Sequence, residues 1–194
     1  MRELTFVQET PEMYASKAMK SYIQQEISNP RKEWILDIVN GRREQRKVKL
    51  CTPEFVLVPT FVQPHPPRHS KAFHWLAVVT DERLRTLRDL EGRHVPMLTD
   101  LYKLACLQIK AETGIDPELI EVYVHYPPSV YRLHVHFAFP KQLCAQPPGR
   151  MHPLAKIIST LAADSEYYSK CSLEVPVFTD TELYEVYCSQ ANLN

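Results

Sequence analysis

The segment Arg132–Phe139, which reads RLHVHFAF, constrains the fold of this chain more than any other. Polar and apolar residues alternate along it, and successive side chains of a β-strand point to opposite faces of a sheet. One face should therefore enter a core with Leu133, Val135 and Phe137. The other face should carry Arg132, His134 and His136. The pattern predicts a half-buried strand that presents two imidazoles and a guanidinium on one surface.

Composition narrows the class of protein. The chain has 194 residues, of which 44% are hydrophobic and 24% charged, so we expect one main globular domain and no membrane partner. The N-terminus lacks the basic and apolar stretches of a secretory signal. Five widely spaced cysteines without a CxxC motif predict reduced thiols in the cytoplasm, and also in the nucleus. The formal net charge is zero, so a local pocket must hold any anionic substrate.

Helical and extended patterns are interleaved along the chain. Helix formers, caps and helical spacing predict helices over residues 11–28, 33–39, 92–113 and 153–163, with a terminal helix capped by Thr179 or Asp180. Apolar and β-branched runs predict strands over residues 47–51, 55–59, 74–80, 121–126, 133–139 and 173–178. The proline-rich stretch 63–70 should be a loop. This order predicts an α+β fold with a mostly antiparallel sheet.

The histidine face suits phosphoryl chemistry. A neutral imidazole is a nucleophile near physiological pH, and a second imidazole can hold charge or carry a proton. The forked donors of Arg132 match phosphate oxygens. We expect the strand before the Pro127-Pro128 connection to bring His125 to the same region, and Ser129 to add a hydroxyl donor.

Other interpretations of these residues are open at this point. A His-x-His pair on a strand is often structural or part of a metal site, but no third ligand with zinc spacing accompanies it, so we expect no metal or other cofactor. Trp34 could be a core anchor, because large aromatic residues are usually buried for packing. The basic residues between Arg42 and Lys49 could be a solvated hairpin edge.

The segment His125–Phe137, HYPPSVYRLHVHF, closely resembles the histidine-triad (HIT) motif of scavenger mRNA decapping enzymes. Further segments resemble that family in the same order, so the resemblance covers nearly the whole chain. These segments are LTFVQET at 4–10, EWILDI at 33–38, FVLVP at 55–59 and LRTLRDL at 84–90. The resemblance implies a HIT-like antiparallel sheet flanked by helices and a sheet-extending homodimer. We expect residues 1–40 to form a helical hinge segment that packs on a catalytic domain at 41–194.

The resemblance also implies an activity. It is the hydrolysis of the triphosphate bridge in 7-methylguanosine cap dinucleotides or short capped RNA remnants, through a covalent nucleotidyl-histidine that releases 7-methylguanosine monophosphate. His134 would be the nucleophile and His136 its triad neighbour, with phosphate contacts from His125, Ser129 and Arg150. Trp34 would stack on the cationic methylated base, worth about 2 kcal/mol when desolvated, and Glu44 would accept hydrogen bonds from the guanine edge. No DNA partner is implied.

The chain departs from the family pattern in three ways. The first triad histidine is Arg132, from which we expect reduced activity. Thr60 and Val62 replace a carboxylate and a lysine, so we expect weaker selection of the base at Thr60 and one phosphate contact fewer. We expect no counterpart in this sequence of the family's separate N-terminal domain, which would either have been trimmed or be absent from the protein. These departures leave two alternatives open: a non-catalytic or weakly active protein that binds caps or nucleotides, and a HIT hydrolase for other dinucleotides.

Overall fold

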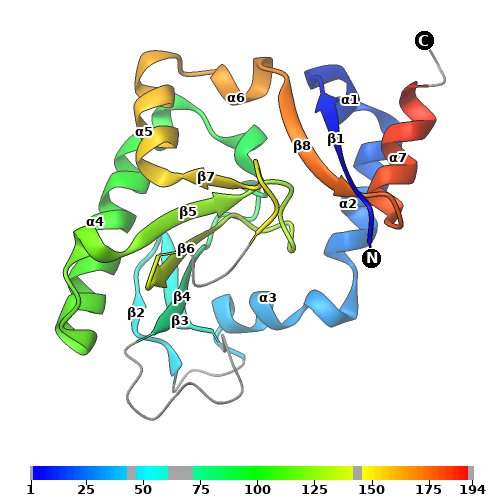
Figure 1. Ribbon diagram of the computed structural model, residues 1–194. Coiled ribbons are helices and arrows are strands. Elements are labelled where there is room, and N and C mark those ends of the chain that lie inside the picture. The colour runs from blue at the N-terminus through cyan, green and yellow to red at the C-terminus, as the bar shows by residue number, and fades with distance from the viewer. Residues whose placement is uncertain (1, 43–46, 61–71, 142–145, 192–194) are drawn as a thin grey trace.

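A computed structural model describes residues 2–42, 47–60, 72–141 and 146–191. Its centre is a six-stranded antiparallel sheet in the order β2-β3-β4-β6-β5-β7, and a two-stranded antiparallel sheet of β1 and β8 lies beside it (Figure 1). The strands are β1 (Leu4–Glu9), β2 (Leu50–Cys51), β3 (Phe55–Pro59), β4 (Phe73–Val79), β5 (Glu121–His125), β6 (His134–Phe139), β7 (Met151–Pro153) and β8 (Leu173–Phe178). The helices are α1 (Pro11–Ala15), α2 (Lys17–Ile27), α3 (Trp34–Val39), α4 (Val95–Thr113), α5 (Leu154–Ala163), α6 (Tyr167–Lys170) and α7 (Glu182–Ala191).

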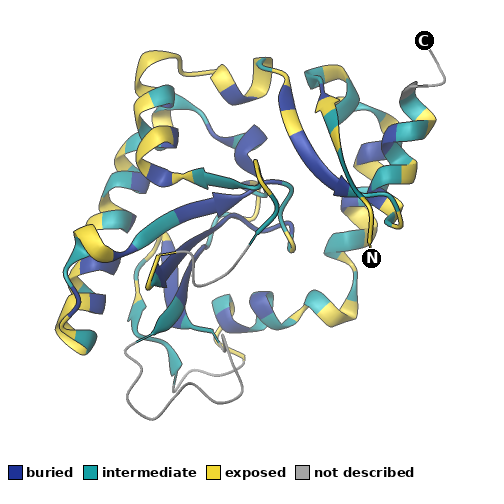
Figure 2. Ribbon diagram, viewed as in Figure 1, coloured by how far each residue is buried: buried dark blue, intermediate teal, exposed yellow. Residues whose placement is uncertain are grey.

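Two hydrophobic clusters cover the two faces of the main sheet. The larger cluster joins alternate residues of β3, β4 and β6 to the buried sides of α4 and α5. The smaller cluster joins the opposite residues of β3 and β4 to Ile35 and Ile38 of α3. Burial on both faces makes the central strands the most buried part of the fold (Figure 2). Because α3 covers only β3 and β4 on its face, the polar residues of β5 and β6 lie beside the smaller cluster.

Helix α4 follows the sequence prediction closely. A 3₁₀ turn at Gly92–His94 precedes it, Pro96 occupies its first turn, and Gly114 ends it with a φ of 71°. Proline fits the first turn because its missing N–H has no helical partner there, and glycine tolerates the left-handed conformation. The helix expected over 92–113 is confirmed from Val95 onward.

The helix expected over residues 11–28 is divided in two. Ser16 takes an extended conformation, ends α1 and caps α2, where its Oγ accepts a hydrogen bond from the backbone N–H of Met19 at 3.1 Å. Serine competes for backbone hydrogen bonds in this way, so it favours a cap over a helix interior. Thr10 caps α1 with Pro11 at its start, as predicted.

Two strands were not predicted. β1 pairs antiparallel with β8, from Leu4 opposite Phe178 to Glu9 opposite Leu173, so the ends of the chain share a sheet. β7 is only three residues long and pairs with the end of β5. The strand expected over 47–51 is shorter than predicted, because pairing with β3 begins only at Leu50.

A buried polar network anchors this second sheet to the main one. Glu9, at the end of β1, accepts hydrogen bonds from Arg88 at 2.8 Å and from Tyr187 at 2.6 Å, and Tyr126 also donates to it. Glu9 is 1% exposed and Arg88 5%. Tyr126 directly follows β5, so the network fixes the start of the connection between β5 and β6.

The α+β class and the antiparallel sheet flanked by helices are confirmed. The homodimer and the division at residue 40 stay predictions. In the described part of the chain, no helix is long and apolar enough to cross a membrane.

Candidate active site

The alternation of β6 is borne out. Leu133, Val135 and Phe137 belong to the larger hydrophobic cluster, and the histidines lie on the opposite face of the sheet. His136 sits between Leu76 of β4 and Tyr123 of β5 in the register of the sheet. The site is therefore built on paired strands at the centre of the sheet, which hold its side chains rigidly.

The sheet gathers three imidazoles around that of His136. Its ring centroid lies 4.1 Å from that of His125, 4.9 Å from that of His134 and 5.0 Å from that of His74. The ring of Tyr123 stacks on it at 4.9 Å with an interplanar angle of 4°. His125, whose face could not be fixed from sequence, thus joins the pair on β6.

The backbone fixes the tautomer of His134. Its Nδ1 lies 2.6 Å from the carbonyl oxygen of Arg132. A carbonyl can only accept, so Nδ1 carries the proton and the lone pair of the neutral ring is on Nε2. Residue 132 makes this contact through its main-chain carbonyl, which an arginine and a histidine both provide. The Arg132 side chain instead donates to the carbonyl of Thr80 at 2.6 Å.

A chain of hydrogen bonds ends on His136. The Oγ1 of Thr60 lies 2.7 Å from Nδ1 of His74, and Nε2 of His74 lies 2.8 Å from Nδ1 of His136. The predicted substrate contact Thr60 therefore already bonds a histidine within the protein. Its contact with substrate stays a prediction.

Burial keeps these histidines neutral. Desolvation lowers the pKa of His74 to about 4, and desolvation together with the positive charge of Arg150 lowers the pKa of His125 to about 3. Burial also lowers the pKa of His134, and it lowers that of His136 well below its ordinary value. The whole cluster is uncharged at physiological pH, which suits an imidazole nucleophile.

Several buried polar atoms in this region lack a hydrogen-bond partner among the described residues. They are Nε2 of His125, Nε2 of His136 and Nε of Arg150. An unpaired buried donor or acceptor costs about 1–3 kcal/mol, so such groups usually await a ligand. Arg150 directly precedes Met151 of β7, which pairs with His125 of β5, and its positive charge contributes to the lowered pKa values of His125, His134 and His136.

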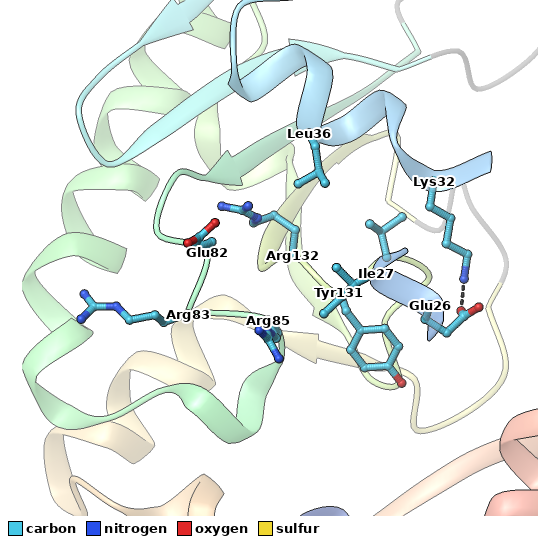
Figure 3. A pocket seen from close by; sticks show the side chains of 10 residues that line it. Glu26, Ile27, Lys32, Leu36, Glu82, Arg83, Arg85, Tyr131 and Arg132 are labelled. Atoms are coloured by element: carbon cyan, nitrogen blue, oxygen red, sulfur yellow. Dashed lines mark hydrogen bonds and ion pairs between the residues drawn. The ribbon is translucent and has the colours of Figure 1, made fainter. Parts of the chain in front are cut away.

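One hollow is lined by His134, and a second shares two arginines with it. A narrow cleft is lined by His125, His134, Arg85 and Arg132 together with Thr86, Val124, Pro128 and Leu133. Arg85 and Arg132 also line a cavity of about 280 Å³, whose other walls come from the ends of α2 and α3, the 82–83 loop, and Val130 and Tyr131 (Figure 3). In Figure 3 the guanidinium of Arg132 points toward Glu82, and Lys32 pairs with Glu26 on the opposite wall. His134 thus lies at a narrow cleft that is also lined by Arg85 and Arg132.

The remaining predicted residues are less closely gathered. Trp34 is half-buried at the start of α3 and packs against the smaller hydrophobic cluster, beside the histidine face. Ser129 is exposed in the connection between β5 and β6. Glu44 lies outside the described residues. The assigned roles of all the predicted site residues stay predictions.

Sequence reasoning missed three residues of the site: His74, Tyr123 and Arg85. His74 and Tyr123 alternate with apolar residues on β4 and β5, which was a usable signal, but only the register brings them to His136. Among residues 2–42, 47–60, 72–141 and 146–191 no group of three His, Cys, Asp or Glu side chains is placed to hold a metal ion. The expectation that no cofactor is needed stays a prediction.

Comparison with known proteins identifies one matching family and several related proteins. A family model described as "Scavenger mRNA decapping enzyme C-term binding" matches residues 33–146, more than half of the chain. The chain is 27% identical over 193 residues to the m7GpppX diphosphatase of Rattus norvegicus, covering 95% of this chain and 55% of that protein. It is 28% identical over 132 residues to the m7GpppX diphosphatase of Schizosaccharomyces pombe, covering 66% of this chain and 42% of that protein. The chain thus spans about half the length of these relatives.

Solved structures with a related shape are more distant. "Hnt3 in complex with DNA and guanosine" superposes with a TM-score of 0.43 at 15% identity, covering 82% of this chain and 96% of that one. "Crystal structure of aprataxin ortholog Hnt3 from Schizosaccharomyces pombe" gives a TM-score of 0.39 at 13% identity, covering 84% and 90%. The first of these proteins binds DNA, which does not match the expectation of no DNA partner. A likeness this distant carries no argument for a DNA substrate here.

Proposed function

Because the chain belongs to the scavenger mRNA decapping enzyme C-terminal family, we propose that it hydrolyses the triphosphate bridge of 7-methylguanosine cap dinucleotides or short capped RNA remnants. The observation that carries the proposal is the hydrogen bond from His134 Nδ1 to the carbonyl of Arg132, which leaves the lone pair of a neutral imidazole on Nε2. The family's first triad histidine is replaced here without loss of that contact.

The reaction proceeds in two displacements at phosphorus. Nε2 of His134 attacks the phosphate next to the methylated nucleoside, an N–P bond forms, and the P–O bond to the remaining diphosphate breaks. Water then attacks the nucleotidyl-histidine, breaks the N–P bond and releases 7-methylguanosine monophosphate. Splitting the hydrolysis in this way lowers the barrier of each step.

Buried cationic and polar groups stabilise the charge on the bridge. Arg85 and Arg132 line the narrow cleft at His134 and also the larger cavity, and Nε of Arg150 is buried without a hydrogen-bond partner among the described residues. A guanidinium binds phosphate oxygens through forked donors and keeps its charge in a partly buried site. The unpaired Nε2 atoms of His125 and His136 add two further polar contacts for phosphate oxygens.

Base recognition rests on Trp34. The indole is half-buried and packs beside the histidine face, so part of its surface is available for stacking. A methylated guanine is cationic and is attracted to an indole face. We expect Trp34→Ala to raise KM more for a methylated than for an unmethylated cap analogue.

Trapping the intermediate tests the proposal. The protein is mixed with a cap dinucleotide labelled in the phosphate next to the methylated base and quenched in mild alkali, in which a phosphoramidate survives. We expect label on His134, none on the His134→Asn variant, and turnover that persists in excess chelator. His94→Asn is the matched control, because His94 caps a surface turn away from the sheet.

Each outcome decides between functions. A His134→Asn variant that turned over substrate as fast as the parent would remove the nucleophile assignment. Tight binding of the cap analogue without label or turnover would favour a non-catalytic nucleotide-binding protein, the alternative suggested by Arg132 in the triad. Faster cleavage of an unmethylated or diadenosine substrate would favour the other HIT activity. The cytoplasmic and nuclear location and the homodimer remain part of this proposal.

A further inference from the structure

The hydrogen-bonded series Thr60–His74–His136 has not been given a role as a unit. It crosses from the end of β3 through β4 to β6, and each member lies on the histidine face of the sheet. His74 is not among the residues expected to touch substrate. Its two ring nitrogens are both engaged, one by Thr60 at 2.7 Å and one by His136 at 2.8 Å.

The hydroxyl proton of Thr60 decides which atom donates in each hydrogen bond of this series. The Thr60 hydroxyl can donate either to Nδ1 of His74 or to the His74 carbonyl, which lies 3.0 Å away. That carbonyl already accepts the backbone N–H of Thr60 at 2.8 Å, and the ring nitrogen is closer. The reverse order, with Nδ1 donating to Oγ1 and the hydroxyl donating to the carbonyl, would also give every atom a partner. The 2.7 Å separation favours donation to Nδ1, because hydroxyl donors typically lie about 2.7–2.8 Å from their acceptors and N–H donors about 2.9–3.0 Å.

The remaining protons follow from this one. If Nδ1 of neutral His74 accepts, its Nε2 carries the proton and donates to Nδ1 of His136. His136 must then hold its own proton on Nε2. That atom is buried and has no hydrogen-bond partner among the described residues. An N–H donor is thus held in a site where an anionic oxygen would complete it.

We propose that Thr60 and His74 are positioning residues, which hold His136 as a neutral imidazole with its proton on Nε2, directed at a phosphate oxygen of the substrate. The proposal rests on the proposed function for the identity of the acceptor. In this role His136 donates a hydrogen bond to the substrate while its imidazole stays neutral. The stacked ring of Tyr123, 4.9 Å away, holds the imidazole plane in place.

Nitrogen NMR of the substrate-free protein tests the proton directly. Protonated and bare imidazole nitrogens resonate in separate regions of the ¹⁵N spectrum, and a His136→Gln spectrum assigns the signals. We expect a protonated Nε2 on His136 in the parent and in Thr60→Ser. In Thr60→Val, which keeps the shape but loses the hydroxyl, we expect the proton on Nε2 to be lost or shared between the two nitrogens.

Kinetics with a methylated cap dinucleotide give the second measurement. We expect Thr60→Val to lower kcat by about tenfold with little change in KM, the size of effect produced by one weakened hydrogen bond in a transition state. Thr60→Ser should restore kcat. His74→Gln, whose amide can accept from Thr60 and donate to His136, should retain more activity than His74→Leu. Thr99→Val is the matched control, because its hydroxyl bonds only within α4.

The results separate this proposal from the proposed function. Unchanged His136 signals in a folded Thr60→Val protein would overturn the positioning role, whatever the activity. A bare Nε2 on His136 in the parent would overturn it as well. Equal kcat for Thr60→Val and the parent would also overturn it. If the signals depend on Thr60 as expected but no cap dinucleotide is cleaved, the tautomer assignment is supported and the proposed substrate is refuted.

Discussion

Acidification should destabilise this protein through its candidate active site. The four clustered imidazoles are neutral in the fold, where His125, His134 and His136 are buried and His74 is half-buried, but they are free to take up protons in the unfolded chain. The unfolded state therefore binds more protons wherever the pH lies between the folded and unfolded pKa values, and stability rises with pH there. The stabilisation is complete above the ordinary histidine pKa and is lost as the pH falls below it.

The magnitude follows from two of these histidines. Their folded pKa values are about 4 for His74 and about 3 for His125, against 6.5 for the ordinary side chain. Between about pH 7.5 and about pH 5, each should cost about 2 kcal/mol of unfolding free energy, or roughly 4 kcal/mol together. The lowered pKa values of His134 and His136 act in the same direction. Such a loss is a large fraction of the stability of a typical domain.

Urea unfolding at a series of pH values measures this dependence. The parent is compared with His74→Gln, His125→Gln and the double variant, with Thr99→Val as a control that changes no ionisable group. We expect each glutamine variant to flatten the dependence by about 2 kcal/mol over this pH range. A parent whose unfolding free energy is constant from about pH 7.5 to about pH 5, or glutamine variants with the parent's slope, would refute the assignment of a buried neutral cluster.

Two further predictions concern residues around the cluster. Glu9→Gln should lower the unfolding free energy, measured by urea unfolding, by about 3–5 kcal/mol, because it leaves the buried Arg88 without its charge partner. Replacing both members of the ion pair, with Glu9→Leu and Arg88→Met, should recover part of that loss. Equal stability of Glu9→Gln and the parent would contradict this. Arg132→His should change the single-turnover rate on a cap dinucleotide by less than about tenfold, because the backbone carbonyl sets the tautomer of His134; a hundredfold change would show that the side chain organises the nucleophile.

The accuracy of the sequence predictions varied with the range of the interactions involved. Capping at Thr10 and Gly114 was read correctly, since a cap depends on residues within one turn. The break at Ser16 was missed, because the same local competition between serine and the backbone can favour either a helix or a cap. β1 was missed because its partner β8 begins more than 160 residues further along the chain.

The sequence by itself determined the α+β class, the strand that carries His134 and His136, and the faces of that strand, because alternation along one strand depends only on neighbouring residues. Only the tertiary structure decided that His125, His74 and Thr60 meet His136. The pairing of β4, β5 and β6 sets that meeting, and a register shifted by one residue would turn each side chain to the opposite face. The burial that keeps the imidazoles neutral is likewise a property of the assembled sheet and the helices packed on it.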